Sequence, residues 1–494
     1  MTKKGFDNQA YIERQSAEIQ KRIRQLGGKL YMEFGGKLFD DYHASRVLPG
    51  FLPDSKIQML KSMADDAEIL IAINAGDIVK NKIRGDLGIT YDQDVLRLID
   101  AFRGFGLFVS SVIITCYTGQ PSAEAFQQKL EKLGLRVYRH YPIEGYPYQV
   151  SKIISEEGFG KNDYVITERP LVVVTAPGPG SGKLAVCLSQ LYHENLHGVK
   201  AGYAKFETFP IWNLPLKHPV NLAYESATAD LNDVNMIDPY HLETYGKTTV
   251  NYNRDVEAFP VLNAMFERIN GFSPYHSPTD MGVNMIGYAI SDDAVCCQAS
   301  KDEILRRYFE AKCALRKGYG TEAAVEKIEM LMRQLSISVE DRPVVGAALA
   351  RAEATEQPAV AIQLPDGRLV TGKTSELLGP SAAALLNAVK GLCHMDREQN
   401  LIPRSVIEPI QRLKVGILGN HNPRLHSDEV LVALSISASV NREAELAYGH
   451  LADLRGCEAH STVILPQVDA DIYRKLGINL TCEPAYQTKR LYHR

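Results

Sequence analysis

Apolar residues recur at helical spacing near the start of the chain. Between residues 10 and 26, four isoleucine or leucine side chains are separated by seven, four and three positions among Glu, Lys and Arg. This spacing places them on one face of an amphipathic helix, and Gly27-Gly28 is a typical helix stop. The sequence therefore predicts a helix over residues 10–26 that packs against a core.

Short apolar runs rich in β-branched and aromatic residues then alternate with helical patterns. A parallel sheet needs such alternation, because each connection between parallel strands crosses over through a helix that covers one face. We therefore expect a Rossmann-like parallel sheet in a first domain, residues 1–155. Its predicted strands are Leu30–Phe34, Glu68–Ile73, Leu107–Thr115 and Leu135–Tyr138, and its predicted helices include Asp94–Arg103 and Ser122–Leu133.

A connection rich in glycine and proline, residues 143–163, marks the first domain boundary. Beyond it, the apolar run Leu171–Thr175 predicts a buried strand that leads through a glycine-rich turn into a helix. Residues 202–275 are dense in aromatic side chains, Pro, Asn and Asp without clear periodicity. This composition is typical either of the walls of a cleft or of packed surface loops. The predicted second domain, an α/β unit, covers residues 156–324.

Helical patterns return at residues 301–317 and 322–335, and a third set of alternating elements follows. We expect a C-terminal α/β domain over residues 325–494. The fold class is therefore α/β throughout, with a P-loop-like strand-turn-helix in the second unit. The predicted strands of the third unit are 359–364, 368–371, 429–435 and 462–465, and its predicted helix is 382–392.

Composition narrows the classes of partner. The chain has 494 residues, of which 45% are hydrophobic, and its formal net charge is −4, a profile typical of folded proteins with several domains. No block of five or more Lys and Arg is present, so we expect no nucleic-acid partner. The N-terminus is polar and no run of about eighteen apolar residues occurs, so we expect a cytoplasmic protein without a membrane partner. Association into a homo-oligomer stays open.

Eight cysteines are scattered along the chain without the paired spacing of a metal site. The adjacent pair Cys296-Cys297 lacks the two-residue gap of a redox motif. The other six are expected to be buried thiols: Cys116, Cys187, Cys313, Cys393, Cys457 and Cys482.

The strongest candidate for chemistry is the glycine-rich turn at residues 176–183, Ala-Pro-Gly-Pro-Gly-Ser-Gly-Lys. Bare backbone at a helix N-terminus lets a phosphate approach the N–H groups closely, and the helix dipole and a lysine favour its negative charge. We predict a phosphorylated small-molecule ligand here, such as a nucleotide with Mg²⁺. The predicted phosphate-binding residues are Gly178, Gly180, Ser181, Gly182 and Lys183, of which Lys183 is also the candidate catalytic group.

The turn departs from the Walker pattern at two positions. Pro177 stands where the first glycine belongs, and Leu184 replaces the Ser or Thr that would hold Mg²⁺. A Mg²⁺ ion would therefore need carboxylates from elsewhere, although acids among Asn and Thr more commonly cap helices and form turns. The alternative for the turn itself is a tight structural connection without a ligand. The downstream acids that could bind the metal or the substrate are Glu207, Glu225, Asp230 and Asp233.

A second string, residues 367–374 (Gly-Arg-Leu-Val-Thr-Gly-Lys-Thr), fits the Walker expression letter for letter. Its context favours another structure, because Pro365-Asp366-Gly367 is a turn signal between two apolar runs. The residues after this turn are predicted to form the return strand of a hairpin. Lys373 and Thr374 are then expected to line a cleft or cap a turn.

A third string, His193-Glu194-Asn195-Leu196-His197, matches HExxH, in which two histidines one helical turn apart bind zinc and the glutamate activates water. It predicts a zinc-dependent hydrolase or peptidase as an alternative function. The extended metzincin form is not met, because Lys200 and Tyr203 occupy the positions of its Gly and His. If Lys183 and His197 share one helix, they lie roughly 20 Å apart, too far for one site. The other interpretation is a pair of histidines that complement the dipole of a helix C-terminus.

The most distinctive strings of the chain are residues 176–183, 202–215, 251–255 and 364–368. In these strings the sequence resembles a bacterial family catalogued as a domain of unknown function, and the resemblance covers the whole chain. It implies a cytoplasmic bacterial protein. Some members of that family carry the label ATP-dependent peptidase, whose two halves match the phosphate-like loop and the HExxH string, but the family supplies no established catalytic residues.

Three functions follow from these motifs. The first is an enzyme that binds a nucleotide or another phosphorylated small molecule at the glycine-rich turn and transfers or hydrolyses a phosphoryl group. The second is zinc-dependent hydrolysis at the HExxH string. The third is a non-catalytic metabolite-binding or assembly protein in which the turn is structural.

Overall fold

The computed structural model describes residues 3–36, 38–39, 41–84, 87–231 and 233–488. Its contacts divide the chain into two compact units. The N-terminal unit holds residues 4–225 and 233–300, and the C-terminal unit holds residues 1–3, 226–232 and 301–494. The two units are described separately below.

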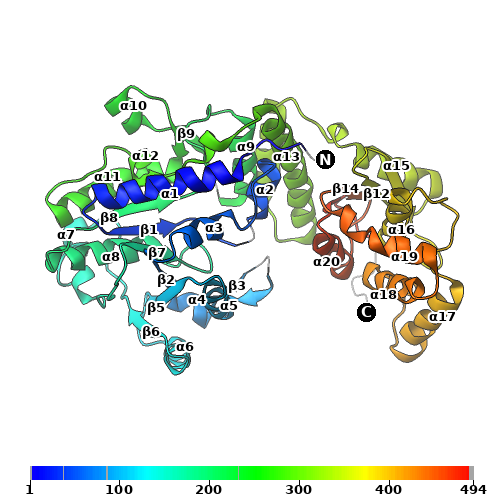
Figure 1. Ribbon diagram of the computed structural model, residues 1–494, viewed down its shortest axis with the longest axis horizontal. Coiled ribbons are helices and arrows are strands. Elements are labelled where there is room, and N and C mark those ends of the chain that lie inside the picture. Colours follow the sequence, from blue (N-terminus) through cyan, green and yellow to red (C-terminus); the bar gives the residue numbers. More distant parts are fainter. Residues whose placement is uncertain (1–2, 37, 40, 85–86, 232, 489–494) are drawn as a thin grey trace. The chain divides into compact units, whose positions relative to one another are not determined.

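A seven-stranded parallel sheet forms the centre of the N-terminal unit, in the order β11-β8-β1-β7-β2-β5-β6 (Figure 1). The expected α/β class with a central parallel sheet is thereby confirmed. Leu30 of β1 is in register with Leu171 of β7 on one side and with Gly202 of β8 on the other. The predicted boundary near residue 155 therefore falls within one sheet. The strands are β1 (Leu30–Phe34), β2 (Ala67–Asn74), β5 (Phe108–Thr115), β6 (Arg136–Arg139), β7 (Leu171–Thr175), β8 (Gly202–Phe206) and β11 (Gly282–Val283).

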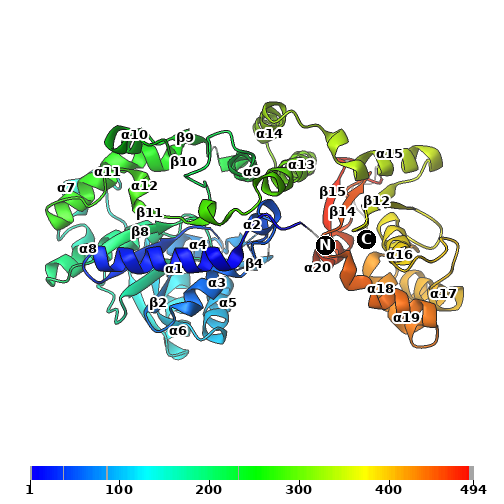
Figure 2. The ribbon, with the colours of Figure 1, turned by 45° about the horizontal axis from the view of Figure 1, so that its top comes forward.

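Helices cover both faces of this sheet. The connections from β1 to β2, β5 and β6 advance in one direction, and those from β6 to β7, β8 and β11 advance in the other, so right-handed crossovers place their helices on opposite faces. On one face, α8 (Lys183–Leu196) and α11 (Asn253–Asn270) share a buried apolar cluster with β7. On the other, α1 (Asn8–Gln25) packs on α3 (Ser55–Ser62), and α5 (Tyr91–Gly104) packs on β2 and β5 (Figure 2).

The first helix, α1, is stabilised by an N-terminal cap and by burial of its apolar face. Asp7 caps α1 by accepting a hydrogen bond from the Ala10 amide, and the isoleucines at positions 12, 19 and 23 are buried along one face. The predicted helix over residues 10–26 is thus confirmed, with its first turn two residues earlier. The remaining short elements before β7 are α2 (Tyr42–Val47), α4 (Ala75–Val79), β3 (Ile83–Arg84), β4 (Ile89–Thr90), α6 (Pro121–Lys132) and α7 (Val150–Ile153).

The aromatic-rich stretch after β8 contains short helices and a two-stranded ribbon. Strands β9 and β10 pair antiparallel, with Val250 opposite Ile237. Besides α11 and β11, this stretch contains α9 (Pro219–Ala227), β9 (Asn235–Ile237), α10 (Pro239–Tyr245), β10 (Val250–Tyr252), α12 (Pro278–Met281) and the start of α13 (Asp293–Lys317).

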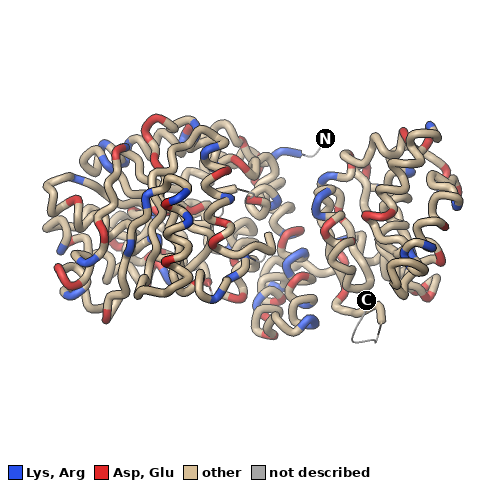
Figure 3. The backbone as a smooth tube through the Cα atoms, turned by 90° about the horizontal axis from the view of Figure 1, so that it is seen from below, with Lys and Arg blue, Asp and Glu red and all other residues tan. Residues whose placement is uncertain are grey.

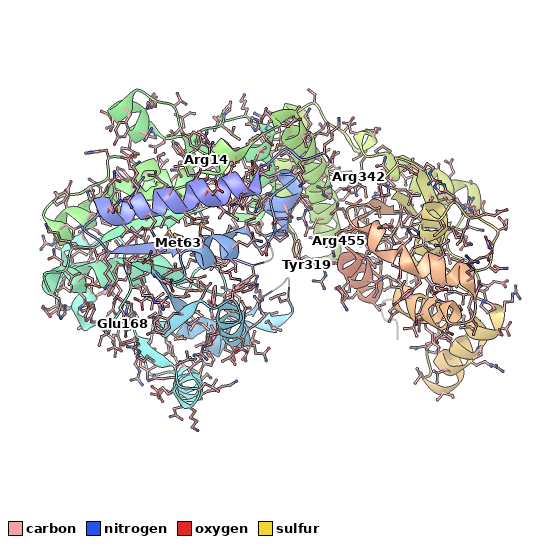
Figure 4. The ribbon with its side chains drawn as sticks, in the orientation of Figure 1. Arg14, Met63, Glu168, Tyr319, Arg342 and Arg455 are labelled. Carbon is pink, nitrogen blue, oxygen red and sulfur yellow. The ribbon has the colours of Figure 1, made fainter. Side chains whose placement is uncertain are left out.

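The C-terminal unit is built on a four-stranded mixed sheet in the order β13-β12-β14-β15. Strands β12 and β13 pair antiparallel with Gln363 opposite Leu369, which confirms the predicted hairpin. Arg342, labelled in Figure 4, is buried and donates hydrogen bonds to the carbonyls of Ala459 and Asn479, which fixes the start of α15 against β14 and β15. The elements are α14 (Glu322–Gln334), α15 (Pro343–Thr355), β12 (Ala359–Gln363), β13 (Leu369–Lys373), α16 (Pro380–Leu392), α17 (Arg404–Arg412), α18 (Ser427–Ala438), α19 (Arg442–Gly449), β14 (Glu458–Ser461), α20 (Gln467–Leu476) and β15 (Asn479–Cys482).

Two predicted strands of this unit are wrong. Residues 429–435 lie inside α18, because His426 and Glu429 form a capping box and Val430, Ala433 and Leu434 are buried at helical spacing. Residues 462–465 follow β14 rather than forming a strand, since the pairing with β12 ends at Ser461.

No helix in the described ranges is long and apolar enough to cross a membrane. Figure 3 shows Lys and Arg interspersed with Asp and Glu along the backbone.

Candidate functional site

The glycine-rich turn lies where the connections of the sheet diverge. From β7 the chain runs through α8 to β8, passing β1, whereas from β2 it runs through α5 to β5 in the opposite direction. In open parallel sheets, such a divergence leaves a crevice at the carboxyl ends of the strands, and ligands bind there. The topology therefore places the turn at the position where a ligand site is expected.

Side chains from neighbouring strands hold the turn in place. The Thr115 hydroxyl at the end of β5 donates a hydrogen bond to the Ser181 carbonyl at 2.8 Å, and the Asn74 amide at the end of β2 donates to the Gly180 carbonyl at 3.3 Å. Within the turn, the Ser181 hydroxyl donates to the Gly178 carbonyl at 2.9 Å. Three carbonyls of the turn are thus occupied, and these hydrogen bonds stabilise its conformation.

The amides at the start of α8 have no such partners. Gly182 caps the helix in a left-handed conformation, with φ +84° and no side-chain cap. No group in the described part of the chain accepts a hydrogen bond from the amides of residues 182–185. The first amides of a helix carry partial positive charge. They remain available to an anion.

These amides lie beside a cavity of about 470 Å³. Lys183 is half-buried, lines the cavity, and forms no ion pair or hydrogen bond with the described residues. Lys183 and Glu33 are the only charged side chains among the described residues that line it. The other lining residues are Thr115, Cys116, His140, Tyr141, Pro142, Ile143, Tyr146, Phe159, Asn162, Gly180, Gly182, Leu184 and Ala185.

Glu33 is a candidate that the motifs did not identify. It lies on β1, in register with Lys205 of β8, and its Oε2 accepts a hydrogen bond of 2.8 Å from the Tyr203 hydroxyl. The sequence could have indicated Glu33 by its position, because it is a carboxylate inside the otherwise buried strand Leu30–Phe34. Burying a charged side chain costs free energy unless it is paired, so such a residue is a candidate for a functional role. The cavity therefore contains both an ammonium and a carboxylate.

Cys116 also lies in the cavity wall, directly after β5. It is exposed, and its φ of +52° is unusual for a residue other than glycine. Neighbouring groups shield its sulfur in part from water, and this desolvation raises the pKa of the thiol. The expectation of a buried thiol holds for Cys187 and Cys457 but is wrong for Cys116, because a residue at the carboxyl end of a strand faces the crevice rather than the core. Burial lowers the pKa of the neighbouring His140 to about 3, so that ring is neutral.

The predicted acids do not line this cavity. Glu207 and Asp255 both pair with Lys205, at 2.8 and 2.6 Å, in the wall of a separate cavity of about 40 Å³. Burial, reinforced by Asp255, raises the pKa of Glu207 to about 7 despite the Lys205 ammonium. Of the remaining predicted acids, Glu225 accepts from the Asn235 amide, Asp233 pairs with Arg254, and Asp230 belongs to the C-terminal unit.

The HExxH string lies at the end of α8, and the side chains of its two histidines and its glutamate contact other groups of the protein. The Glu194 carboxylate is buried and pairs with Lys29 at 2.6 Å, and it accepts a 2.6 Å hydrogen bond from the Tyr31 hydroxyl. The His193 ring bonds the Phe159 carbonyl at 3.0 Å, and the His197 ring bonds the His193 carbonyl at 2.7 Å. This arrangement favours a structural role for the string.

The second Walker-like string belongs to the C-terminal unit. Its residues 369–373 are β13, whose backbone pairs with β12. The Thr374 amide donates to the Pro358 carbonyl at 2.9 Å. Backbone groups used in a sheet cannot cradle a phosphate.

Substitution of two glycines tests the shape of the turn. Gly180 and Gly182 both have φ near +80°, where alanine is strained by about 1 kcal/mol or more. A Cβ on Gly180 would meet open space, whereas one on Gly182 would lie 3.1 Å from the Thr115 methyl. We expect Gly182→Ala to lower the free energy of unfolding more than Gly180→Ala does, as measured by urea denaturation. Equal losses would contradict the described packing of Gly182.

Comparisons with known proteins cover the whole chain. Residues 4–336 match the family described as "Domain of unknown function DUF1846, N-terminal", and residues 340–492 match "Domain of unknown function DUF1846, C-terminal". A UPF0371 protein of Streptococcus pyogenes serotype M5 (strain Manfredo) is 58% identical over 489 residues, 99% of both chains. A UPF0371 protein of Streptococcus thermophilus (strain CNRZ 1066) is 58% identical over 494 residues, 100% of both chains. These matches confirm the resemblance indicated by the sequence strings.

Proposed function

This chain belongs to the bacterial family of the DUF1846 domains, and from the geometry of its larger cavity we propose that it binds a phosphorylated small molecule in the cytoplasm and acts on the phosphoryl group. The observation that carries the proposal is the set of unpaired amides at residues 182–185 beside the unpaired Lys183 ammonium. A phosphate oxygen satisfies both, because it accepts hydrogen bonds and carries negative charge.

Glu33 supports the involvement of a divalent cation. A carboxylate in the same cavity would repel a phosphate unless a cation lies between them. Mg²⁺ is usually held by one or two carboxylates together with substrate phosphates. Glu33 offers an oxygen ligand in the cavity, which the side chain of Leu184 cannot supply. When bound, Mg²⁺ would neutralise charge on the phosphoryl oxygens. Nucleotides and sugar phosphates both satisfy these requirements.

Lys183 is the proposed catalytic residue, because its ammonium can stabilise charge on the phosphoryl oxygens. Phosphoryl transfer and hydrolysis depend mainly on positioning and on stabilisation of the charge of the phosphoryl oxygens. A lysine held at the helix N-terminus supplies that stabilisation, and the fixed turn supplies the positioning. A chain that binds such ligands without turnover would instead be a metabolite-binding protein.

Ligand-dependent stabilisation of wild type and Glu33→Gln tests the proposal. Wild type is expected to gain thermal stability with ADP, ATP or a sugar phosphate, and more so with Mg²⁺, because a ligand that binds only the folded state stabilises it. Glu33→Gln is expected to keep the gain with inorganic phosphate alone and to lose the Mg²⁺-dependent part. Glu168→Gln, at an exposed position, is the matched control.

Two outcomes would contradict these expectations separately. No stabilisation of wild type by any ligand would contradict the phosphate site. Equal Mg²⁺-dependent gains in wild type and Glu33→Gln would contradict only the role of Glu33.

A further inference from the structure

A second group of side chains that can bind a metal lies away from the glycine-rich turn, at the start of α13. Asp293 and Cys297 are one helical turn apart and therefore project from the same face. His218, which directly precedes α9, meets them there. All three residues belong to the N-terminal unit.

One ligand atom from each of the three residues lies within 4.8 Å of the other two. His218 Nε2 lies 3.0 Å from Asp293 Oδ1 and 3.6 Å from Cys297 Sγ, and Cys297 Sγ lies 3.6 Å from Asp293 Oδ2. Around a tetrahedral zinc ion, with Zn–N of about 2.0 Å and Zn–S of about 2.3 Å, ligand atoms are separated by roughly 3.3–3.6 Å. Small side-chain movements would bring all three atoms to such an ion.

The chemistry of the three groups selects the kind of cation. Imidazole, thiolate and carboxylate are the ligands of Zn²⁺, whereas Mg²⁺ and Ca²⁺ prefer oxygen alone. We propose that His218, Asp293 and Cys297 bind a zinc ion, or another divalent cation of similar softness, with a fourth position open to water. Because the Asp293 side chain is 61% exposed, an ion can enter from solvent.

Binding would change two hydrogen bonds of His218. Its Nδ1 accepts from the Val220 amide at 3.3 Å, and its Nε2 faces Asp293. Coordination through Nε2 requires the ring proton on Nδ1, so the Val220 contact must break. A neutral hydrogen bond of this length is weak, and coordination replaces the contact with Asp293.

Cobalt(II) is the probe, because a thiolate bound to cobalt gives a charge-transfer absorption in the near ultraviolet. The full chain, freed of metal with a chelator, is titrated with cobalt chloride. Wild type is expected to develop this absorption up to one equivalent, and zinc is expected to displace the cobalt. Lys183→Ala is expected to behave like wild type, since the glycine-rich turn is a separate site.

Neighbouring cysteines provide a matched pair of variants. Cys297→Ser is expected to lose the absorption, whereas Cys296→Ser is expected to keep it, because Cys296 Sγ is buried and directed at the Gly5 carbonyl. His218→Asn and Asp293→Asn are expected to weaken cobalt binding at least about 10-fold. Asn at position 218 retains a side chain that can cap α9.

The proposal is overturned if wild type gives no thiolate absorption at one equivalent of cobalt. It is also overturned if Cys297→Ser keeps the absorption, or if neither His218→Asn nor Asp293→Asn weakens binding. Asp293→Asn keeps the test valid if another variant fails to fold, because its side chain is largely exposed.

Discussion

Replacement of Lys183 by alanine is expected to weaken the binding of inorganic phosphate and of phosphorylated ligands about 10- to 100-fold. A hydrogen bond to a charged group contributes about 1.5–3 kcal/mol, and Lys183 is the one cationic side chain among the described residues that line the cavity. Binding should be reduced rather than abolished, because the amides of residues 182–185 remain. Isothermal titration calorimetry with ADP and with phosphate measures the difference.

The control for this experiment is Lys129→Ala. Lys129 lies on α6 and is exposed, and alanine is favourable in a helix. The control should bind like wild type. Equal affinities of wild type and Lys183→Ala would contradict the assignment of Lys183, and would leave the amides as a structural helix start.

Regular elements with strong local signals could be predicted from the sequence. The buried strands Leu30–Phe34 and Leu171–Thr175 have the predicted bounds, because an apolar run flanked by glycine or proline leaves few other structures. The helix after the glycine-rich turn begins at Lys183 as predicted. Local signals were thus sufficient to locate the backbone that we propose binds an anion.

The rest of the site depends on strand order, which local patterns do not determine. Strand β7 is inserted between β1 and β2, and this brings Asn74, Thr115 and Glu33 next to a turn near residue 180. Acids close in sequence, such as Glu207, were the natural candidates, yet Glu207 lines another cavity beside Lys205. Residues from the ends of distant strands could be grouped only once the sheet was known.

The shortness of one apolar run explains why a strand was predicted at residues 429–435 of the C-terminal unit. The run around Val430 to Leu434 is short, and a short apolar run fits a strand and a buried helix equally well. The capping box of His426 and Glu429 stabilises the start of a helix, and the run is therefore helical.

The largest effect on stability is expected from Lys29→Met. The Glu194 side chain is 1% exposed, and Lys29 is its cationic partner at 2.6 Å. Removing one partner of a buried ion pair leaves an uncompensated charge and costs about 3–5 kcal/mol. Urea denaturation should show this loss in the free energy of unfolding, with an unchanged dependence on denaturant.

A double variant separates the ion pair from a zinc role of the HExxH string. Glu194→Gln removes the charge that Lys29→Met leaves behind, so the double variant should be more stable than Lys29→Met alone. If Glu194 instead served a zinc site, Lys29→Met would have a small effect and zinc would stabilise wild type but not His193→Ala. A loss below about 1 kcal/mol, the value for an ordinary exposed pair, would contradict the buried pair. If the ion pair explains the string, the free energies of unfolding of the two single variants and the double variant should give a coupling energy between residues 29 and 194, and added metal should not change it.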